Sequence, residues 1–159
     1  MVSIQSAEFD EQREHPGFQS RRVRLGRQAG SERIGLSLWE IPPGEAAYPY
    51  HFHLVSEELL INLSGRPSLR TPNGWRDLEA GEIVSLPVGE QGAHQLVNRT
   101  DNPVRFLAVS DRASDIVIRP DSETISVYDR SAPADSFHHT FRLEDAVDYF
   151  EGEHHNGGS

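Results

Sequence analysis

The sequence predicts an all-β protein, a sandwich or closed barrel of short strands, and three observations support this prediction. Short alternating or β-branched apolar runs follow one another from Arg21 onward, and such runs are typical of strands. Turn residues such as glycine, proline and asparagine separate the runs at short intervals, as in sandwiches and barrels. Only the stretch around Leu143 to Phe150 permits a helix, and its length is marginal.

The expected strands can be read in chain order. Apolar residues alternate over 34–38, which is the period of a half-buried strand, and the Pro-Pro-Gly at 42–44 then breaks the chain. Thr71-Pro72-Asn73-Gly74 is expected to join two short strands as a hairpin, because Asn-Gly supports a positive φ at both central positions. Further strands are expected over residues 58–63, 83–86, 95–98 and 104–109.

The chain length of 159 residues fits one domain with a sizeable core. Residues 1–18 show no steady periodicity and are expected to form an extended N-terminal arm. Residues 19–150 would then form a single barrel domain, with its most informative motifs in a core at 44–98. The polar, glycine-containing stretch 151–159 is expected to be a flexible tail.

Composition excludes several classes of function. The chain has a formal charge of -10, 15 arginines and no lysine, so lysine Schiff-base chemistry is excluded and nucleic-acid binding is disfavoured. The absence of cysteine excludes disulfides and thiolate ligands. No apolar run is long enough to span a membrane, and the N-terminus lacks the pattern of a signal peptide, so we expect a cytoplasmic protein.

The one basic cluster, formed by Arg21, Arg22, Arg24 and Arg27, is interpreted as a solvated strand edge. Alternating charged residues are common on exposed faces of strands, so this cluster is not expected to bind nucleic acid.

Three histidines and a glutamate are the candidate metal ligands. His51 and His53 are two residues apart, so in a strand both side chains point to the same face. A carboxylate from the pair Glu57–Glu58 follows on the returning strand, and His94 would arrive from a distant strand. Imidazole and carboxylate together suit divalent Fe, Mn, Ni, Co, Cu or Zn. The spacing therefore predicts a site for one such ion.

The two blocks that carry these residues resemble the paired motifs of the cupin superfamily. The first cupin motif reads G-x5-H-x-H-x(3,4)-E-x6-G, and residues 44–65 match it with one extra residue between Gly44 and His51. The second reads G-x5-P-x-G-x2-H-x3-N, and residues 81–98 match it with two extra residues before His94. The resemblance implies that the metal ligands are His51, His53, Glu58 and His94. It also implies that Gly65, Gly81, Pro87, Gly89 and Asn98 have structural roles.

Because six residues separate Glu58 from Gly65, the motif favours Glu58 as the ligand, and strand alternation then turns Glu57 away. The flanking runs IGLSLWEIPPG, NPVRFLAVSDR, RPDSETISVYD and FRLEDAVDYFEGE are similar to a bacterial single-domain cupin subfamily. The resemblance implies a double-stranded β-helix, the cupin jelly-roll barrel, with strand extensions at Arg21–Leu25 and Thr124–Val127. In related barrels such extensions pair across a homodimer.

The resemblance leaves the reaction open, because one barrel supports many activities. Our first hypothesis is a metal-dependent enzyme, of the oxygenase type, that acts on a small organic molecule. We expect Leu60 and Leu96 to make its pocket largely apolar. Asn62 is a candidate polar contact, and a position of Tyr48 at the pocket mouth is a minor alternative for that loop residue. An isomerase or decarboxylase is an alternative, although no obvious general base is found. A module that binds a small molecule without turnover is a second alternative, and a purely structural metal ranks last.

Overall fold

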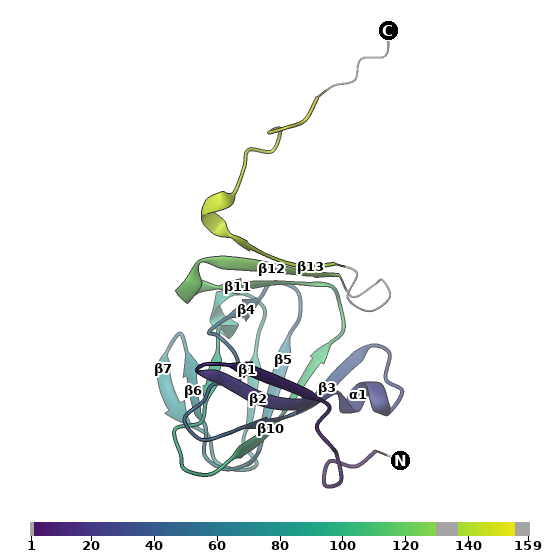
Figure 1. Ribbon diagram of the computed structural model, residues 1–159, viewed down its shortest axis with the longest axis vertical. Coiled ribbons are helices and arrows are strands. Elements are labelled where there is room, and N and C mark those ends of the chain that lie inside the picture. Colours follow the sequence, from purple (N-terminus) through teal and green to yellow (C-terminus); the bar gives the residue numbers. More distant parts are fainter. Residues whose placement is uncertain (1, 130–136, 155–159) are drawn as a thin grey trace.

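The computed structural model describes residues 2–129 and 137–154, and within them the chain forms three antiparallel sheets (Figure 1). The largest sheet has the strand order β1 (Glu11–His15), β2 (Phe18–Val23), β3 (Ile34–Ile41), β10 (Val104–Asp111), β5 (Glu58–Ser64) and β8 (Ile83–Leu86). A second sheet has the order β13 (Phe137–Arg142), β12 (Thr124–Asp129), β11 (Asp115–Arg119) and β4 (Phe52–His53). The third has the order β7 (Gly74–Asp77), β6 (Ser68–Thr71) and β9 (Gln95–Val97).

The all-β jelly-roll prediction is confirmed, although the hydrogen-bonded strands form separate sheets and not one closed cylinder. Two isolated bridges, Ala46 with Val97 and His51 with His94, join the first motif block to the second. The distant His94 is thereby brought beside His51, as the sequence predicts for residues on different strands.

Helical structure is sparse and does not lie where the sequence places it. The stretch 143–150, predicted as the possible helix, has one short 3₁₀ turn, η3 (Leu143–Asp145). Two similar turns are η1 (Glu90–Gly92) and η2 (Pro120–Ser122). The short helix α1 (Leu25–Gln28) begins at the end of the predicted N-terminal strand extension, and Leu25 packs against Val23 and Leu38.

Strand β3 is buried on both faces, whereas its alternation predicts a half-buried strand. Trp39 and Ile41 belong to the interior cluster of buried side chains. Leu38 belongs to a second cluster on the other face, with Leu36 packed against it. Segments that precede β3 cover this outer face, and they contribute the side chains Ala7, Phe9, Val23 and Leu25.

The region predicted as an extended N-terminal arm contains a strand. Strand β1 pairs in register with β2, from Glu11 opposite Arg22 to His15 opposite Phe18. Strand β2 in turn pairs with β3, so the cluster at Arg21–Arg24 begins on an inner strand of the sheet and not on its edge. The interpretation of this cluster as a strand edge is therefore wrong, whereas Arg21, Arg24 and Arg27 are solvent-exposed, as expected.

The hairpin predicted at residues 71–74 is present, with a different turn. Strands β6 and β7 pair from Thr71 opposite Gly74, so Pro72 and Asn73 occupy the central positions. Gly74 has a φ of +107°, whereas Asn73 does not have a positive φ. The cause is Pro72, whose ring fixes a negative φ at the first central position.

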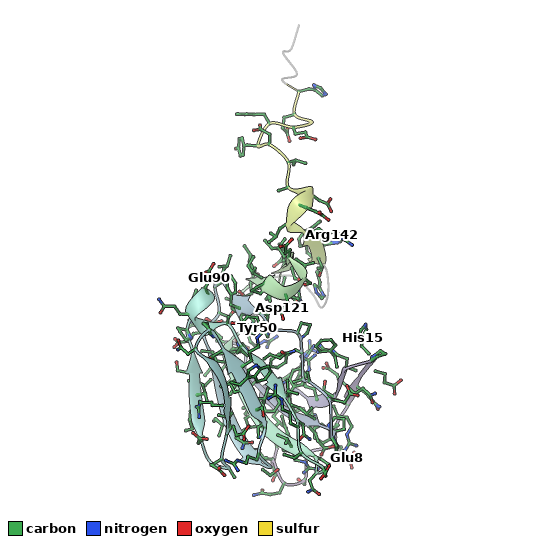
Figure 2. The ribbon with its side chains drawn as sticks, turned by 90° about the vertical axis from the view of Figure 1, so that its left-hand side faces the viewer. Glu8, His15, Tyr50, Glu90, Asp121 and Arg142 are labelled. Carbon is green, nitrogen blue, oxygen red and sulfur yellow. The ribbon has the colours of Figure 1, made fainter. Side chains whose placement is uncertain are left out.

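The C-terminal hairpin β12–β13 lies at one end of the molecule, and the chain beyond it projects away from the body (Figure 1). Tyr149 and Phe150 are 87% and 71% exposed on this segment. Figure 2 shows Arg142, the last residue of β13, with Asp121 and Tyr50 at the adjoining end of the body. Of the predicted tail 151–159, residues 155–159 lie outside the described chain. The described helices are too short and too polar to cross a membrane.

Candidate metal centre

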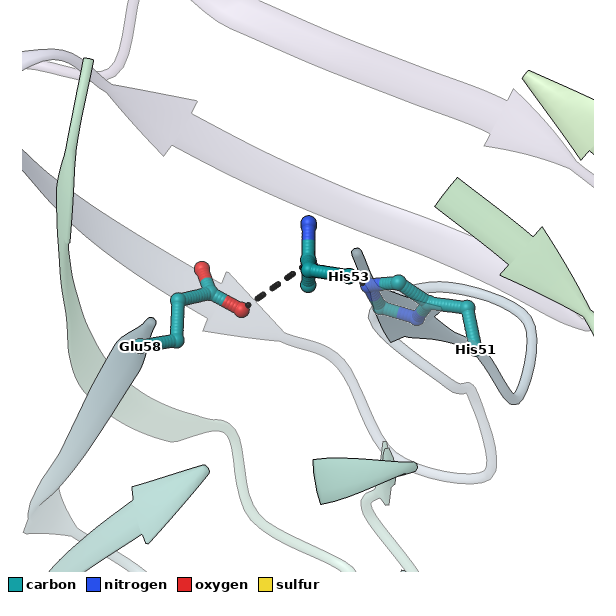
Figure 3. A group of neighbouring side chains, drawn as sticks. All are labelled: His51, His53 and Glu58. Atoms are coloured by element: carbon teal, nitrogen blue, oxygen red, sulfur yellow. Dashed lines mark hydrogen bonds and ion pairs between the residues drawn. The ribbon is translucent and has the colours of Figure 1, made fainter. Parts of the chain in front are cut away.

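The four predicted ligands converge inside the jelly roll from three places in the chain. His51 precedes the two-residue strand β4, and His53 is the second residue of that strand. Glu58 is the first residue of β5, and His94 lies between η1 and β9. Figure 3 shows His51, His53 and Glu58 pointing toward one another, with an ion pair between His53 and Glu58.

The ligand atoms are close enough to share one ion. Nε2 of His51 lies 3.1 Å from Nε2 of His53, and Oε2 of Glu58 lies 3.3 Å from Nε2 of His53. The same glutamate oxygen lies 3.4 Å from Nε2 of His94. His51, His53 and Glu58 offer ligand atoms that all lie within 4.8 Å of one another. The carboxylate oxygen is thus the common neighbour of two imidazoles.

Each imidazole is oriented by a hydrogen bond at its other nitrogen. Nδ1 of His51 lies 2.9 Å from the carbonyl oxygen of Pro49, and Nδ1 of His94 lies 2.9 Å from that of Gly92. Nδ1 of His53 lies 2.6 Å from a carboxylate oxygen of Asp115. Because these partners are acceptors, each Nδ1 carries a proton and donates it. All three Nε2 atoms can then present lone pairs to the same point, as metal-binding histidines do.

The environment of His94 tests whether a cation fits this centre. Its side chain is fully buried, and Nε2 has no hydrogen-bond partner among the described residues. A buried polar nitrogen without a partner is costly, and here it faces a carboxylate. A divalent ion between Nε2 and Glu58 would satisfy both groups. The donor set of imidazole nitrogens and one carboxylate oxygen therefore fits a first-row divalent metal.

Without metal, the pKa values of the neighbouring His51 and His53 are shifted in opposite directions. Burial, reinforced by the nearby His94 and His53, lowers the pKa of His51 well below its ordinary value. Burial also opposes protonation of His53, but its hydrogen bonds to Asp115 and Glu58 outweigh burial and raise the pKa of His53 to about 9. For Glu58, burial is outweighed by the contacts with His53 and His94, which hold its pKa well below the usual range.

The choice between the paired glutamates agrees with the structure. Glu58 faces the imidazoles, whereas Glu57 accepts a hydrogen bond from Ser85 Oγ at 3.4 Å in an exposed position. Asn98 is structural, as expected: its side-chain amide donates to the carbonyl oxygens of Ile41 and Asn102 at 3.0 and 2.8 Å. Gly65 packs so closely that an added Cβ would lie 2.7 Å from a methyl carbon of Val104.

Residues 37–110 match the family model described as the cupin domain. This chain carries a cupin domain. Among curated protein sequences, none is significantly similar to the chain.

Several solved structures share the fold of this cupin over most of its length. A protein from Acidithiobacillus ferrooxidans assigned as a sugar phosphate isomerase is 22% identical, with a TM-score of 0.79 and coverage of 93% of this chain and 95% of the other. A sugar phosphate isomerase of the cupin superfamily from Silicibacter pomeroyi is 24% identical, with a TM-score of 0.79 and coverage of 92% and 94%. A polyketide cyclase from Streptomyces resistomycificus is 25% identical, with a TM-score of 0.59 and coverage of 70% and 78%.

Asp115 is a residue of this cupin's site that the sequence does not reveal. It lies at the start of β11 and is buried, and its carboxylate also accepts hydrogen bonds from the backbone N–H groups of Val55, Ser56 and Ile116. Burial opposes its ionisation, but the contact with His53 prevails and lowers the pKa of Asp115. No local signal marks Asp115, because it is 62 residues from His53 and outside both motifs.

Tyr48 lies against the candidate ligands and not at a pocket mouth. Its ring meets those of His51 and His94 edge-on, at centroid distances of 4.9 and 5.4 Å. It also packs against Trp39, which stacks on Phe106. The phenol oxygen is buried without a hydrogen-bond partner among the described residues. Burial, together with the charge of Glu58, raises the pKa of Tyr48 well above its ordinary value, so the phenol stays protonated.

A cavity of about 560 Å³ adjoins the centre, and Glu58 is the candidate ligand that lines it. The predicted apolar pocket is not found there. Leu60 and Leu96 pack into the interior cluster and do not line the cavity, and Asn62 donates to the carbonyl oxygens of Gly65 and Leu78. Five arginines and Trp39 contribute to the lining instead. The arginines are Arg13, Arg22, Arg24, Arg27 and Arg112.

Proposed function

We propose that this cupin is a metal-dependent enzyme that acts on a small organic molecule bound in the cavity beside Glu58. The ion would be held by His51, His53, Glu58 and His94. One observation carries the proposal: all three Nδ1 atoms are engaged by oxygen acceptors, which directs the three Nε2 atoms toward the Glu58 carboxylate. A divalent ion in such a site supplies Lewis acidity to a coordinated substrate oxygen.

The protein's own residues would divide the remaining work. Asp115 would fix the tautomer of His53 and keep its Nε2 directed at the ion. Tyr48 would remain a neutral phenol, so it can donate a proton but not accept one at neutral pH. Asp129 and His138 line the same cavity and are the groups placed to move a proton on the substrate. These residues supply the proton-transfer groups that the sequence does not make obvious.

An isomerisation is the reaction class that we favour. The cavity lining is largely polar, which suits a hydroxylated or oxo substrate better than an aromatic one. Two structures that cover more than 90% of this chain are assigned as sugar phosphate isomerases. Oxygenase chemistry is the second candidate, because four protein ligands would leave two open positions on an octahedral ion.

The test is a comparison of turnover with and without oxygen. Protein purified anaerobically would be analysed for metal and then incubated with aldoses, ketoses and their phosphates, with and without dioxygen. We expect product that does not require oxygen and that disappears in Asp129→Asn or His138→Gln when metal content is unchanged. Oxygen uptake that depends on substrate would favour the oxygenase. Saturable ligand binding without product would favour a binding module.

We also propose a homodimer. The outer face of β5 and β8 exposes Leu59 and Ile83, and the C-terminal segment exposes Val147, Tyr149 and Phe150. A second copy would remove these apolar side chains from water, which is the usual role of large exposed apolar patches. Light scattering after gel filtration should give twice the chain mass. A monomer at micromolar concentration would contradict the proposal.

A further inference from the structure

The arginines of the cavity are concentrated in a protein that is otherwise strongly acidic. The chain has a net charge of -10, yet five arginines line this one cavity. The carboxylates of the lining are Glu58, which belongs to the candidate metal centre, and Asp129. The volume of about 560 Å³ is within the range of pockets that bind small molecules. The lining is therefore suited to a ligand that carries negative charge.

Two of these arginines are held over an aromatic platform. The guanidinium carbon of Arg22 lies 4.8 Å from the ring centroid of Trp39, and that of Arg13 lies 6.0 Å away. Trp39 is itself fixed by stacking on Phe106, with the rings 7° from parallel. Arg13 also donates from Nη1 to the carbonyl oxygen of Ala47 at 2.7 Å. Guanidinium groups that are held in place in this way lose less side-chain entropy when they bind a ligand.

Among the described residues, Arg13 and Arg22 have one carboxylate partner between them, Glu11. In residues 2–129 and 137–154, Arg13 makes no ion pair with a carboxylate. Arg22 pairs with Glu11, but the same carboxylate is shared with Arg24. Burial, and then the charge of Arg22, lowers the pKa of Arg13, although Tyr128 and Glu11 act in the other direction and Arg119 adds to the repulsion. An added anion would relieve this repulsion.

We propose that Arg13 and Arg22, held over Trp39, form a subsite that binds the anionic end of the substrate. The ligand chemistry is an oxyanion, the phosphoryl or carboxylate group of a small molecule, because a guanidinium binds either through paired N–H donors. This inference rests on the proposed function in one respect: the same cavity contains Glu58, so the rest of the substrate would extend toward the metal.

Tryptophan fluorescence gives a direct test, because one of the two tryptophans lies under the subsite. Trp75 is exposed on the hairpin β6–β7, so a Trp75→Phe background leaves Trp39 as the only reporter. Inorganic phosphate and succinate would be titrated separately at constant ionic strength. We expect a saturable change in Trp39 emission with at least one of them. A response to phosphate alone would assign a phosphoryl group, and a response to succinate alone a carboxylate.

Arg13→Gln and Arg22→Gln should each weaken that binding by about tenfold or more, since each removes a charge-assisted hydrogen-bond donor. Arg76→Gln is the matched control, because Arg76 pairs with Glu82 outside the cavity, and it should leave binding unchanged. Arg13→Lys and Arg22→Lys keep the charge and the side-chain stem, and they should bind with intermediate affinity in a folded protein. Thermal melts would confirm that each variant is folded.

Two results would overturn the subsite: no response to either anion, or an equal response in wild type and in both glutamine variants. The proposed function is tested separately by His94→Ala, which should lose metal and still bind the anion. If the wild-type protein binds no metal but its anion binding still depends on Arg13 and Arg22, the metal proposal is contradicted and the subsite proposal is supported.

Discussion

The two ends of the cavity are built in different ways. At the metal end, Nδ1 of every imidazole is within hydrogen-bonding distance of an oxygen acceptor. Two of these acceptors are carbonyl oxygens two residues away in the chain. At the arginine end, Arg13 and Arg22 come from the N-terminal hairpin and meet a tryptophan of β3. The first end combines these two local contacts with the long-range contact between Asp115 and His53. The second end depends on the pairing of the N-terminal hairpin with β3.

This difference explains which functional residues can be read from sequence. Strand periodicity places His51 and His53 on one face, and the motif spacing selects Glu58 and His94. Nothing local distinguishes Arg22 from the exposed arginines around it, because its position over Trp39 follows from the pairing of β1 with β2 and of β2 with β3. If the two ends are independent, a change at one end should leave ligand binding at the other unchanged.

The largest effect is expected from removing a ligand at the metal end. His94→Ala should weaken metal binding by more than about a hundredfold, since losing a ligand should cost more than losing a residue that merely orients one. Competition with a chromophoric chelator for cobalt would measure this. His15→Ala, an exposed histidine of the β1–β2 hairpin, is the control and should retain full affinity. If His94→Ala binds metal as tightly as the wild-type protein does, His94 is not a metal ligand.

Metal binding should depend steeply on pH. The pKa of His53 is raised to about 9, so without metal His53 is protonated at neutral pH and must release a proton when an ion binds. The apparent affinity should therefore rise by about tenfold per pH unit between pH 6 and 8 and level off above pH 9. Titration in buffers of different ionisation enthalpy would count the released protons. An affinity that is flat across this range would show that His53 does not bind the ion.

A smaller effect is expected for Asp115→Asn. The amide has nearly the same shape but no charge, so it holds the His53 ring less firmly, and metal affinity should fall by about ten- to a hundredfold. Anion binding at the arginine end should not change, because Asp115 does not line the cavity. A parallel loss of anion binding in this variant would show that the two ends are coupled.

The smallest effect is expected for Tyr48→Phe, measured as the free energy of unfolding. The phenol oxygen is buried without a partner, so its removal should raise stability by about 1 kcal/mol while the ring packing is kept. Urea unfolding of metal-free protein would measure this. If turnover falls while stability rises, the phenol has a role in the reaction; a loss of stability would mean that it has a hydrogen-bond partner in solution.

The sequence predicts the jelly roll, the cupin motifs and the four converging side chains. It misses α1 and strand β1, because both are short and depend on contacts with other elements. Leu25 of α1 packs on the outer face of β3, and β1 forms by pairing with β2. It misses Asp115 for a related reason, since the contact with His53 is made only when β11 pairs with β4. The prediction of an apolar pocket is wrong because Leu60 and Leu96, whose side chains point inward from their strands, pack into the core and not beside a cavity.

Anomalous diffraction from crystals of the metal-loaded protein, recorded at the absorption edge of the bound metal, tests the metal centre most directly. The account predicts one peak per chain, about 2.0–2.3 Å from the Nε2 atoms of His51, His53 and His94 and from a Glu58 carboxylate oxygen. A peak elsewhere, such as at His138 and His139 on β13, or the absence of a peak between the four side chains, would contradict it.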